Sequence, residues 1–241
     1  MRAARTGAVL TVSFVRPDQL NAQTPATWAA LRAIGEQLDD GVRVVVLRGE
    51  GHAFSTGLDR SVLPGLAAEL APLPADPAEE RIRGWQAAFR WLRSPGVVSV
   101  AAVQGHAVGA GAQLALACDL RVVADDLQLR VPEATLGLVP DLTGTSSLVE
   151  LAGCSRAVEL CLTGRAVGAA EAVALGVATT AVPTDRLDAA VAELTTALLA
   201  LDPGAARETL ALLRSAVRHG PAVQDAAERA APVRRLRTLT S

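Results

Sequence analysis

Short apolar runs alternate with amphipathic stretches through the first three quarters of the chain. Runs rich in valine and leucine, bounded by glycine, proline or charged residues, are typical of strands buried in a sheet. The alternating run 8–15 ends at a turn at Arg16-Pro17-Asp18. The pattern predicts strands at 8–15, 42–47, 97–103, 119–124, 127–131 and 177–182.

Other stretches place apolar residues at helical spacing. The first begins at Thr24, a good N-cap residue, followed by Pro25 at the first helical position. The predicted helices are 24–38, 82–92, 145–152, 155–162, 169–175, 187–201, 203–218 and 222–231. Between them, the proline- and alanine-rich segment 63–79 predicts a mobile surface segment or lid. Strands alternate with helices up to about residue 182, so we expect an α/β core over 1–183 and a helical region over 184–241.

The stretch Val103–Asp119 organises this pattern. Gly105, Gly109 and Gly111 make a tight turn between a buried strand and a helix at 112–118 that is apolar nearly all round. Such a turn leaves free backbone N–H groups at the positive end of the helix, which suits an oxyanion or a phosphate. The spacing matches neither GxGxxG nor a phosphate-binding P-loop.

Composition narrows the possible partners. Half of the 241 residues are hydrophobic, 20% are charged and the net charge is −2, which gives no electrostatic footprint for nucleic acid or an anionic membrane. The chain contains no lysine, so any basic contact to a phosphate must use arginine. Cys118, Cys154 and Cys161 lie in apolar runs without metal-ligand spacing, which favours buried free thiols in a reducing cytosol. We therefore expect a cytoplasmic protein without a signal peptide, membrane span or metal.

Three carboxyl groups are candidates for chemistry. Glu133 lies in an apolar loop at 132–144, where burial would raise its pKa and suit proton transfer; capping of residues 135–137 or pairing with an arginine is an equal alternative. Asp141, just before Thr143-Gly144-Thr145, is by itself more typical of a helix N-cap. Asp59 ends the small-residue loop 53–59, and a capping role is favoured there too. The three histidines form no triad-like or metal-binding pattern.

Taken together, these motifs resemble the enoyl-CoA hydratase/isomerase (crotonase) family, over roughly residues 5–230. The matching pieces, in family order, are Arg16-Pro17 with Leu20-Asn21-Ala22, Ala53-Phe54-Ser55-Thr56-Gly57-Leu58-Asp59, Ala102–Gly111, Cys118-Asp119-Leu120-Arg121, Pro132-Glu133 with Leu136-Gly137, and Leu162-Thr163-Gly164 with Gly176-Val177.

The resemblance implies a spiral of ββα turns with a helical C-terminal trimerisation region, assembled as a homotrimer or a dimer of trimers. It implies an acyl-CoA thioester as substrate, with no separate cofactor. The N–H groups of Leu58 and Ala110 match the pair that holds the thioester oxygen as an enolate develops, an arrangement typically worth ~10²–10³ in rate per donor. The surrounding loops implied to bind the substrate contain Leu20, Ala22, Phe54, Gly57, Asp59, Gly109, Gly111 and Gln113.

The acid/base residues depart from the hydratase pattern. Hydratases of the family carry two glutamates; Glu133 matches the second, but Gln113 stands in place of the first and cannot exchange a proton. The offset between Glu133 and Asp141 resembles the carboxylate pair of the dienoyl-CoA isomerases, which have an aspartate where Gln113 stands. The leading hypothesis is therefore an enoyl-CoA or dienoyl-CoA isomerase with Glu133 as principal base and acid and Asp141 as a second relay. The alternatives are a hydratase with a Gln113-held water and a non-catalytic acyl-CoA-binding protein.

Overall fold

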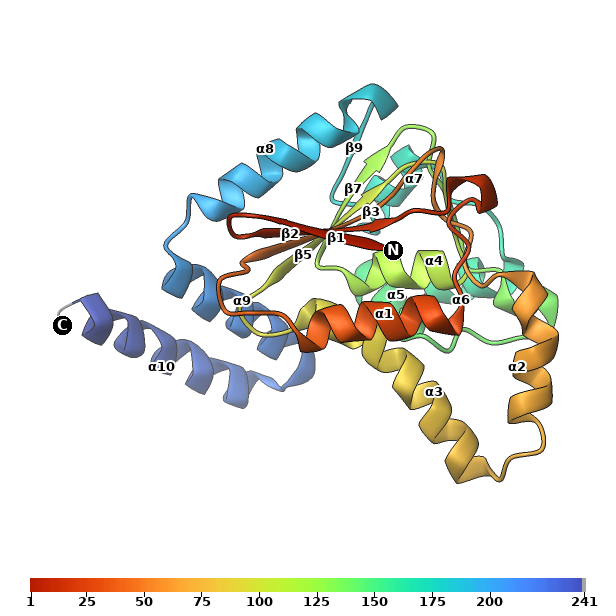
Figure 1. Ribbon diagram of the computed structural model, residues 1–241. Helices are drawn as coiled ribbons and strands as arrows, with labels where there is room; N and C mark the ends of the chain where they lie inside the picture. Colours follow the sequence, from red (N-terminus) through yellow and green to blue (C-terminus); the bar gives the residue numbers. More distant parts are fainter. Residues whose placement is uncertain (240–241) are drawn as a thin grey trace.

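Two sheets wind through the first three quarters of the chain (Figure 1). The coordinates are a computed structural model that describes residues 1–239. The large sheet has the order β1-β2-β3-β5-β7-β9, antiparallel between β1 and β2 and parallel elsewhere. Its strands are β1 (Arg2–Thr6), β2 (Val9–Phe14), β3 (Val44–Gly49), β5 (Val98–Val103), β7 (Leu120–Ala124) and β9 (Thr180–Val182).

A small parallel sheet runs beside the large one, with the order β4-β6-β8. Its strands are β4 (Ala53–Ser55), β6 (His106–Val108) and β8 (Gln128–Arg130). Each follows a strand of the large sheet, so the chain passes from β3 to β4, from β5 to β6 and from β7 to β8. This repeated passage confirms the expected spiral of ββα turns.

Three strands were not predicted from the sequence. β4 and β6 lie where a loop and a tight turn were expected, since three residues are too few to display an alternating pattern. β1 pairs along the edge of β2 with all five of its residues exposed, so it carries no apolar face to recognise.

Every predicted helix is present, but the one predicted at 82–92 begins at 75, the one predicted at 222–231 extends to 239, and a further helix lies at 63–70. Thr24 caps the first of them through a reciprocal hydrogen-bond pair with Thr27, as its sequence predicted. They are α1 (Pro25–Glu36), α2 (Leu63–Leu70), α3 (Ala75–Arg90), α4 (Ala110–Ala117), α5 (Gly144–Ala152), α6 (Cys154–Thr163), α7 (Ala169–Ala174), α8 (Leu187–Leu199), α9 (Pro203–Arg218) and α10 (Pro221–Leu239).

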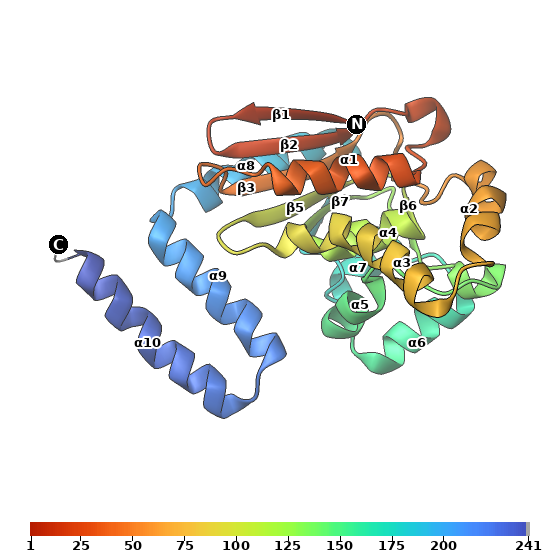
Figure 2. The same ribbon diagram turned by 60° about the horizontal axis from the view of Figure 1, so that its bottom comes forward.

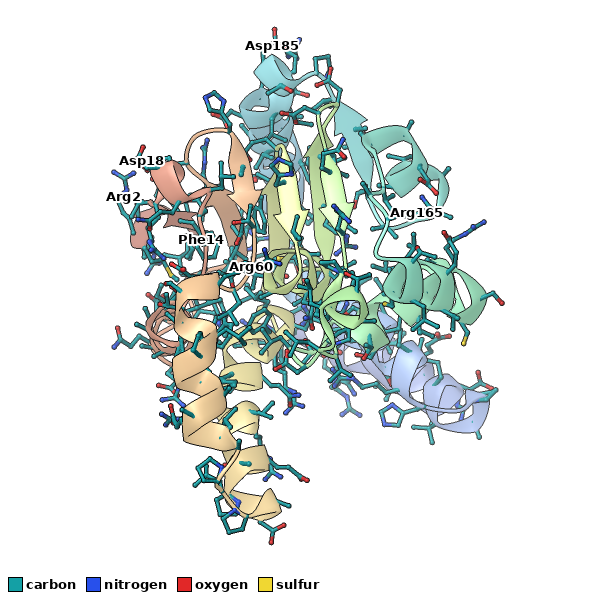
Figure 3. All side chains as sticks on the ribbon, turned by 90° about the vertical axis from the view of Figure 1, so that its right-hand side faces the viewer. Arg2, Phe14, Asp18, Arg60, Arg165 and Asp185 are labelled. Atoms are coloured by element: carbon teal, nitrogen blue, oxygen red, sulfur yellow. The ribbon has the colours of Figure 1, made fainter. Side chains whose placement is uncertain are left out.

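At 63–79 the structure differs from the mobile surface segment or lid that the sequence predicted. This segment is helical, forming α2 and the first turn of α3, although it does lie on the surface. Figures 2 and 3 show α2 and α3 as an arm that extends away from the sheets. Arg81 of α3 pairs with Glu69 of α2 at 2.6 Å and joins the two helices. Prolines at the start of α2 and before α3 favour helix starts rather than a loop.

The core lies on both faces of the large sheet. On one face, α4 is buried along its whole length, and Trp28 of α1 packs against Phe89 of α3. On the other face, Leu187 and Val191 of α8 pack on valines of the central strands. The helical region 184–241 therefore begins as a layer of the core, and only α9 and α10 project from it as a helical hairpin (Figure 2).

The thiols differ from expectation. Cys118 is buried, but Cys161 is partly accessible and Cys154 is exposed at the start of α6. Within residues 1–239 no single helix has the length and hydropathy to cross a membrane, although the pair 184–199 and 203–218, bent by 105°, meets those criteria jointly.

Asp119 fastens α9 to the sheet. Its carboxylate accepts hydrogen bonds from Ser99 and from Arg214 of α9, and both side chains of the ion pair are 15% exposed. Asp119→Ala leaves a largely buried guanidinium without its counter-ion, so we expect a loss of about 3 kcal/mol in the free energy of unfolding. Asp188→Ala, which breaks the exposed pair with Arg48, should cost under about 1 kcal/mol. Urea denaturation of both variants measures the difference, and equal losses would contradict this assignment.

Candidate active site

Two segments far apart in the sequence are joined beside the small sheet. The amide of Gln23 donates to the carbonyl of Gly57 at 2.7 Å, and the amide of Asp59 donates to the carbonyl of Gln23 at 2.7 Å. The amide of Thr56 donates to the carbonyl of Leu20. Leu20 has a φ of 48°, and Ala22 accepts from the Arg16 guanidinium at 2.8 Å. The loops predicted to bind substrate therefore form one fixed unit.

A buried network of polar side chains stabilises these joined loops. The Gln23 side chain is fully buried, accepts from the Trp28 indole at 2.7 Å and donates to the Ser55 hydroxyl at 2.9 Å. The same hydroxyl accepts from the amide of Gly57 at 3.2 Å. The sequence analysis did not single out Gln23 or Ser55. Nothing in one sequence marks them beyond their place next to the Thr24 cap and within the 53–59 loop.

The amides of Leu58 and Ala110 are free to bind a ligand. Neither donates a hydrogen bond within residues 1–239. Ala110 is the first residue of α4, so its N–H has no acceptor inside the helix. A Cβ added to Gly57 would lie only 3.0 Å from the Ala110 nitrogen. The residue before Leu58 therefore lies against the start of α4. An oxyanion hole formed by the Leu58 and Ala110 amides stays a prediction.

Glycine is needed at this junction. Gly57 has a φ of +82° and Gly109 a φ of +54°, which side-chain-bearing residues rarely adopt. A Cβ on Gly111 would overlap the carbonyl of Ser55. Phe54 differs from the prediction, because its side chain is fully buried against Phe14 and supports the loop from the core instead of lining the site.

The Glu133 carboxyl faces this junction. A Cβ on Gly109 would lie 3.4 Å from its Oε1, so the acid borders the residue before the Ala110 donor. Glu133 is only 8% exposed, and no arginine pairs with it within residues 1–239. Instead, Gln113 Nε2 donates to its Oε1 at 2.7 Å, while its Oε2 is buried with no hydrogen-bond partner within the described chain. One oxygen is fixed and the other is left to exchange a proton.

Gln113 is oriented by the backbone. Its Oε1 accepts from the amides of Leu142 at 2.8 Å and Gly144 at 3.2 Å, so its NH₂ group must point to Glu133. The pKa of Glu133 is raised, chiefly by burial and further by the charge of Asp141, while hydrogen bonds from its own backbone and from Gln113 lower it. Gln113 therefore acts as a clamp on the carboxylate.

Asp141 is not a helix cap. The N-cap residue of α5 is Thr143, and no side chain caps that helix. The Asp141 carboxyl is partly buried, which raises its pKa, and it lies close enough to act electrostatically on Glu133. Two carboxyls with raised pKa values therefore lie within electrostatic range of each other. A proton relay through Asp141 stays a prediction.

Asp59 does cap the segment that follows it. Its carboxylate accepts from the amide and hydroxyl of Ser61 and pairs with Arg16 at 3.1 Å, contacts that lower its pKa. No group of three or more metal-ligating side chains gathers within residues 1–239. A contact between Asp59 and substrate stays a prediction.

Removing the Gln113 clamp should move the pH dependence of turnover. The working form of Glu133 is its carboxylate, so kcat/KM falls as the pH drops through its raised pKa. Gln113→Met removes the hydrogen bond that lowers this pKa, so we expect the acid limb of the pH profile to move to higher pH. Profiles of kcat/KM for wild type and variant measure the shift. An acid limb that moves to lower pH, or does not move, would contradict the role of the Gln113 hydrogen bond in lowering the pKa of Glu133.

Comparisons with known proteins show the family of this chain. The family model for enoyl-CoA hydratase/isomerase matches residues 4–239. A protein of Mycobacterium bovis named probable enoyl-CoA hydratase is 30% identical over 198 residues, 81% of this chain and 74% of its own. A Thermobifida fusca protein named as an enoyl-CoA hydratase, solved with CoA, is 44% identical with a TM-score of 0.93, covering 99% of this chain and 93% of its own. The structure of the same protein with acetoacetyl-CoA also has a TM-score of 0.93, and it covers 98% of this chain and 94% of its own.

Fold and site together define a crotonase-type protein. The chain belongs to the enoyl-CoA hydratase/isomerase family.

Proposed function

We propose that this protein is an acyl-CoA isomerase that shifts a carbon–carbon double bond through a thioester dienolate. The observation that carries the proposal is the Glu133–Gln113 pair: one buried carboxyl with a free oxygen, held by an amide where hydratases of the family have the first of their two glutamates. A CoA thioester as ligand is supported by the relatives solved with CoA and acetoacetyl-CoA.

The reaction needs a base and an electrophile. Glu133 Oε2 takes a proton from C2, and the electrons move onto the thioester oxygen, where the N–H groups of Leu58 and Ala110 stabilise the developing charge. The same carboxyl, now protonated, returns the proton at C4. With a 3,5-dienoyl substrate, Asp141 would deliver or remove the more distant proton.

Hydration places a different demand on the site. Water attack at C3 needs a second group to orient and deprotonate the water, and Gln113 cannot take its proton. Its carbonyl oxygen is already occupied by two amides, so it has little capacity left to hold water. These contacts favour isomerisation over the hydratase alternative. A non-catalytic binding protein is disfavoured because both carboxyls remain beside the oxyanion donors.

A panel of three substrates tests the proposal. Purified protein should convert 3-enoyl-CoA or 3,5-dienoyl-CoA to the shifted isomer, with slow hydration of 2-enoyl-CoA. Gln113→Glu should raise hydration by orders of magnitude, because it supplies the missing carboxylate. Rapid hydration by the wild type without isomerisation would overturn the proposal. Tight acyl-CoA binding with no turnover, unchanged in Glu133→Ala, would support the binding protein instead.

A further inference from the structure

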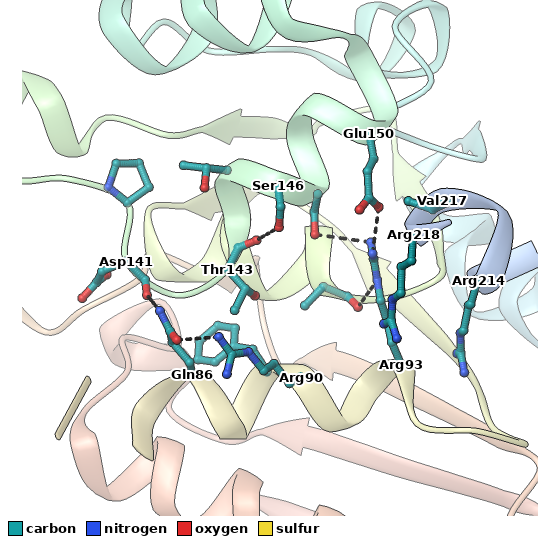
Figure 4. A pocket seen from close by; sticks show the side chains of 15 residues that line it. Gln86, Arg90, Arg93, Asp141, Thr143, Ser146, Glu150, Arg214, Val217 and Arg218 are labelled. Atoms are coloured by element: carbon teal, nitrogen blue, oxygen red, sulfur yellow. Dashed lines mark hydrogen bonds and ion pairs between the residues drawn. The ribbon is translucent and has the colours of Figure 1, made fainter. Parts of the chain in front are cut away.

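A cavity outside the thioester site concentrates positive charge. It has a volume of about 460 Å³ and lies among α3, α5 and α9 (Figure 4). The cavity is not lined by Leu58, Ala110 or Glu133. Its charged lining consists of four arginines and two carboxylates, although the net charge of the chain is −2. The arginines are Arg90, Arg93, Arg214 and Arg218, and the carboxylates are Asp141 and Glu150.

Two of the four guanidinium groups are already engaged. Arg93 pairs with Glu150 at 2.9 Å, and Arg214 holds Asp119. Arg90 is different, since within residues 1–239 its side chain donates only to the neutral amide oxygen of Gln86, at 2.7 Å. The side chain of Arg218, near the end of α9, makes no hydrogen bond or ion pair within the same residues. Two positive charges, from α3 and α9, therefore lack a counter-ion on this cavity.

The opposite wall offers further donors. It is the start of α5, where Thr145 and Ser146 lie in the first turn and no side chain caps the helix. The Gly144 amide already donates to Gln113, so the helix dipole and the later amides of this turn are the features that favour an anion. Phe89 and Val217 add apolar surface, and the volume lies in the range of sites for small molecules. Asp141, the remaining unpaired carboxyl, lies at the edge of the cavity (Figure 4).

We propose that this cavity binds a small anion, a carboxylate or phosphate group, between the guanidinium groups of Arg90 and Arg218 and the first turn of α5. Guanidinium groups bind both kinds of anion with charge-assisted hydrogen bonds, often two at once. The anion comes either from a free small molecule or from the far end of an acyl group that carries a terminal carboxylate. The cavity shares Asp141 with the proposed isomerisation, but neither the oxyanion donors nor Glu133 lines it, so anion binding does not depend on that reaction.

Calorimetric titration with inorganic phosphate tests the site without any turnover. Wild type should bind phosphate, and Arg90→Gln and Arg218→Gln should each weaken binding about tenfold, equal to about 1.4 kcal/mol. Arg229→Gln is the matched control, because Arg229 is exposed on α10 away from the cavity and the variant has the same net charge. Absence of binding to wild type, or equal weakening in all three variants, would overturn the proposal.

Turnover distinguishes the two sources of the anion. If the substrate supplies it, Arg90→Gln and Arg218→Gln should lower kcat/KM about tenfold for an acyl-CoA with a terminal carboxylate and leave the plain acyl-CoA unchanged. If the anion is a free molecule, Arg90→Gln and Arg218→Gln should weaken phosphate binding but change kcat/KM for the two acyl-CoA substrates by the same factor. Failure of the isomerase assay alone would leave the phosphate result standing, so the two proposals fail separately.

Discussion

Glu133→Gln should lower kcat/KM for isomerisation of 3-enoyl-CoA by about 10²–10⁴-fold, the usual contribution of a general acid–base group. Glutamine has nearly the same shape and can still accept the hydrogen bond from Gln113, so the fold is expected to be kept. The loss then reflects the missing proton transfer at the oxygen that is buried without a partner.

Steady-state kinetics and a thermal melt of the variant measure this effect. Glu80→Gln is the matched control, because Glu80 is 67% exposed and pairs only with the neighbouring Arg83. It should retain wild-type kcat/KM. A Glu133→Gln enzyme within tenfold of wild type would show that another group moves the proton.

Gly57→Ala should lower kcat/KM by about 10²–10³-fold, the cost of losing one oxyanion donor. The added methyl group would overlap the carbonyl of Val108 and press on the Ala110 nitrogen, and a φ of +82° is strained for alanine. The 57–58 loop must shift away from α4, so the Leu58 and Ala110 donors no longer converge on one oxygen.

Gly65→Ala provides the comparison for this variant. Gly65 lies in α2 with open space around it, and alanine is the better helix former. It should keep full activity and gain a few tenths of a kcal/mol to about 1 kcal/mol in stability. Equal losses of activity in the two variants would mean that the Gly57 junction is not part of the catalytic geometry.

The sequence was sufficient for the elements with a strong periodic pattern. The strands of the large sheet other than β1, and most helices, lie close to their predicted positions, because most of them bury an apolar face. The three short strands of the small sheet were less well predicted, as β4 and β6 show. Their backbone pairing positions the oxyanion loops, yet a run of three residues carries almost no pattern.

For the candidate site, residue type pointed to Glu133 as a buried carboxyl but not to its hydrogen-bond partner. The apolar surroundings of Glu133 predicted a raised pKa, and the structure agrees. The sequence could not decide between a cap, an arginine and a free carboxyl, because its partner Gln113 comes from another element. Asp141 was expected by itself to cap a helix, and Phe54 to contact substrate. Both expectations failed because they depend on side-chain direction, which a linear sequence does not carry.

The most direct test of the account follows the C2 protons of 3-enoyl-CoA in D₂O by NMR. The wild-type protein should exchange these protons for deuterium while the double bond moves, because Glu133 removes a C2 proton and the Leu58 and Ala110 amides stabilise the resulting enolate. Exchange should be lost in both Glu133→Gln and Gly57→Ala. Exchange at the wild-type rate in Glu133→Gln would contradict the account.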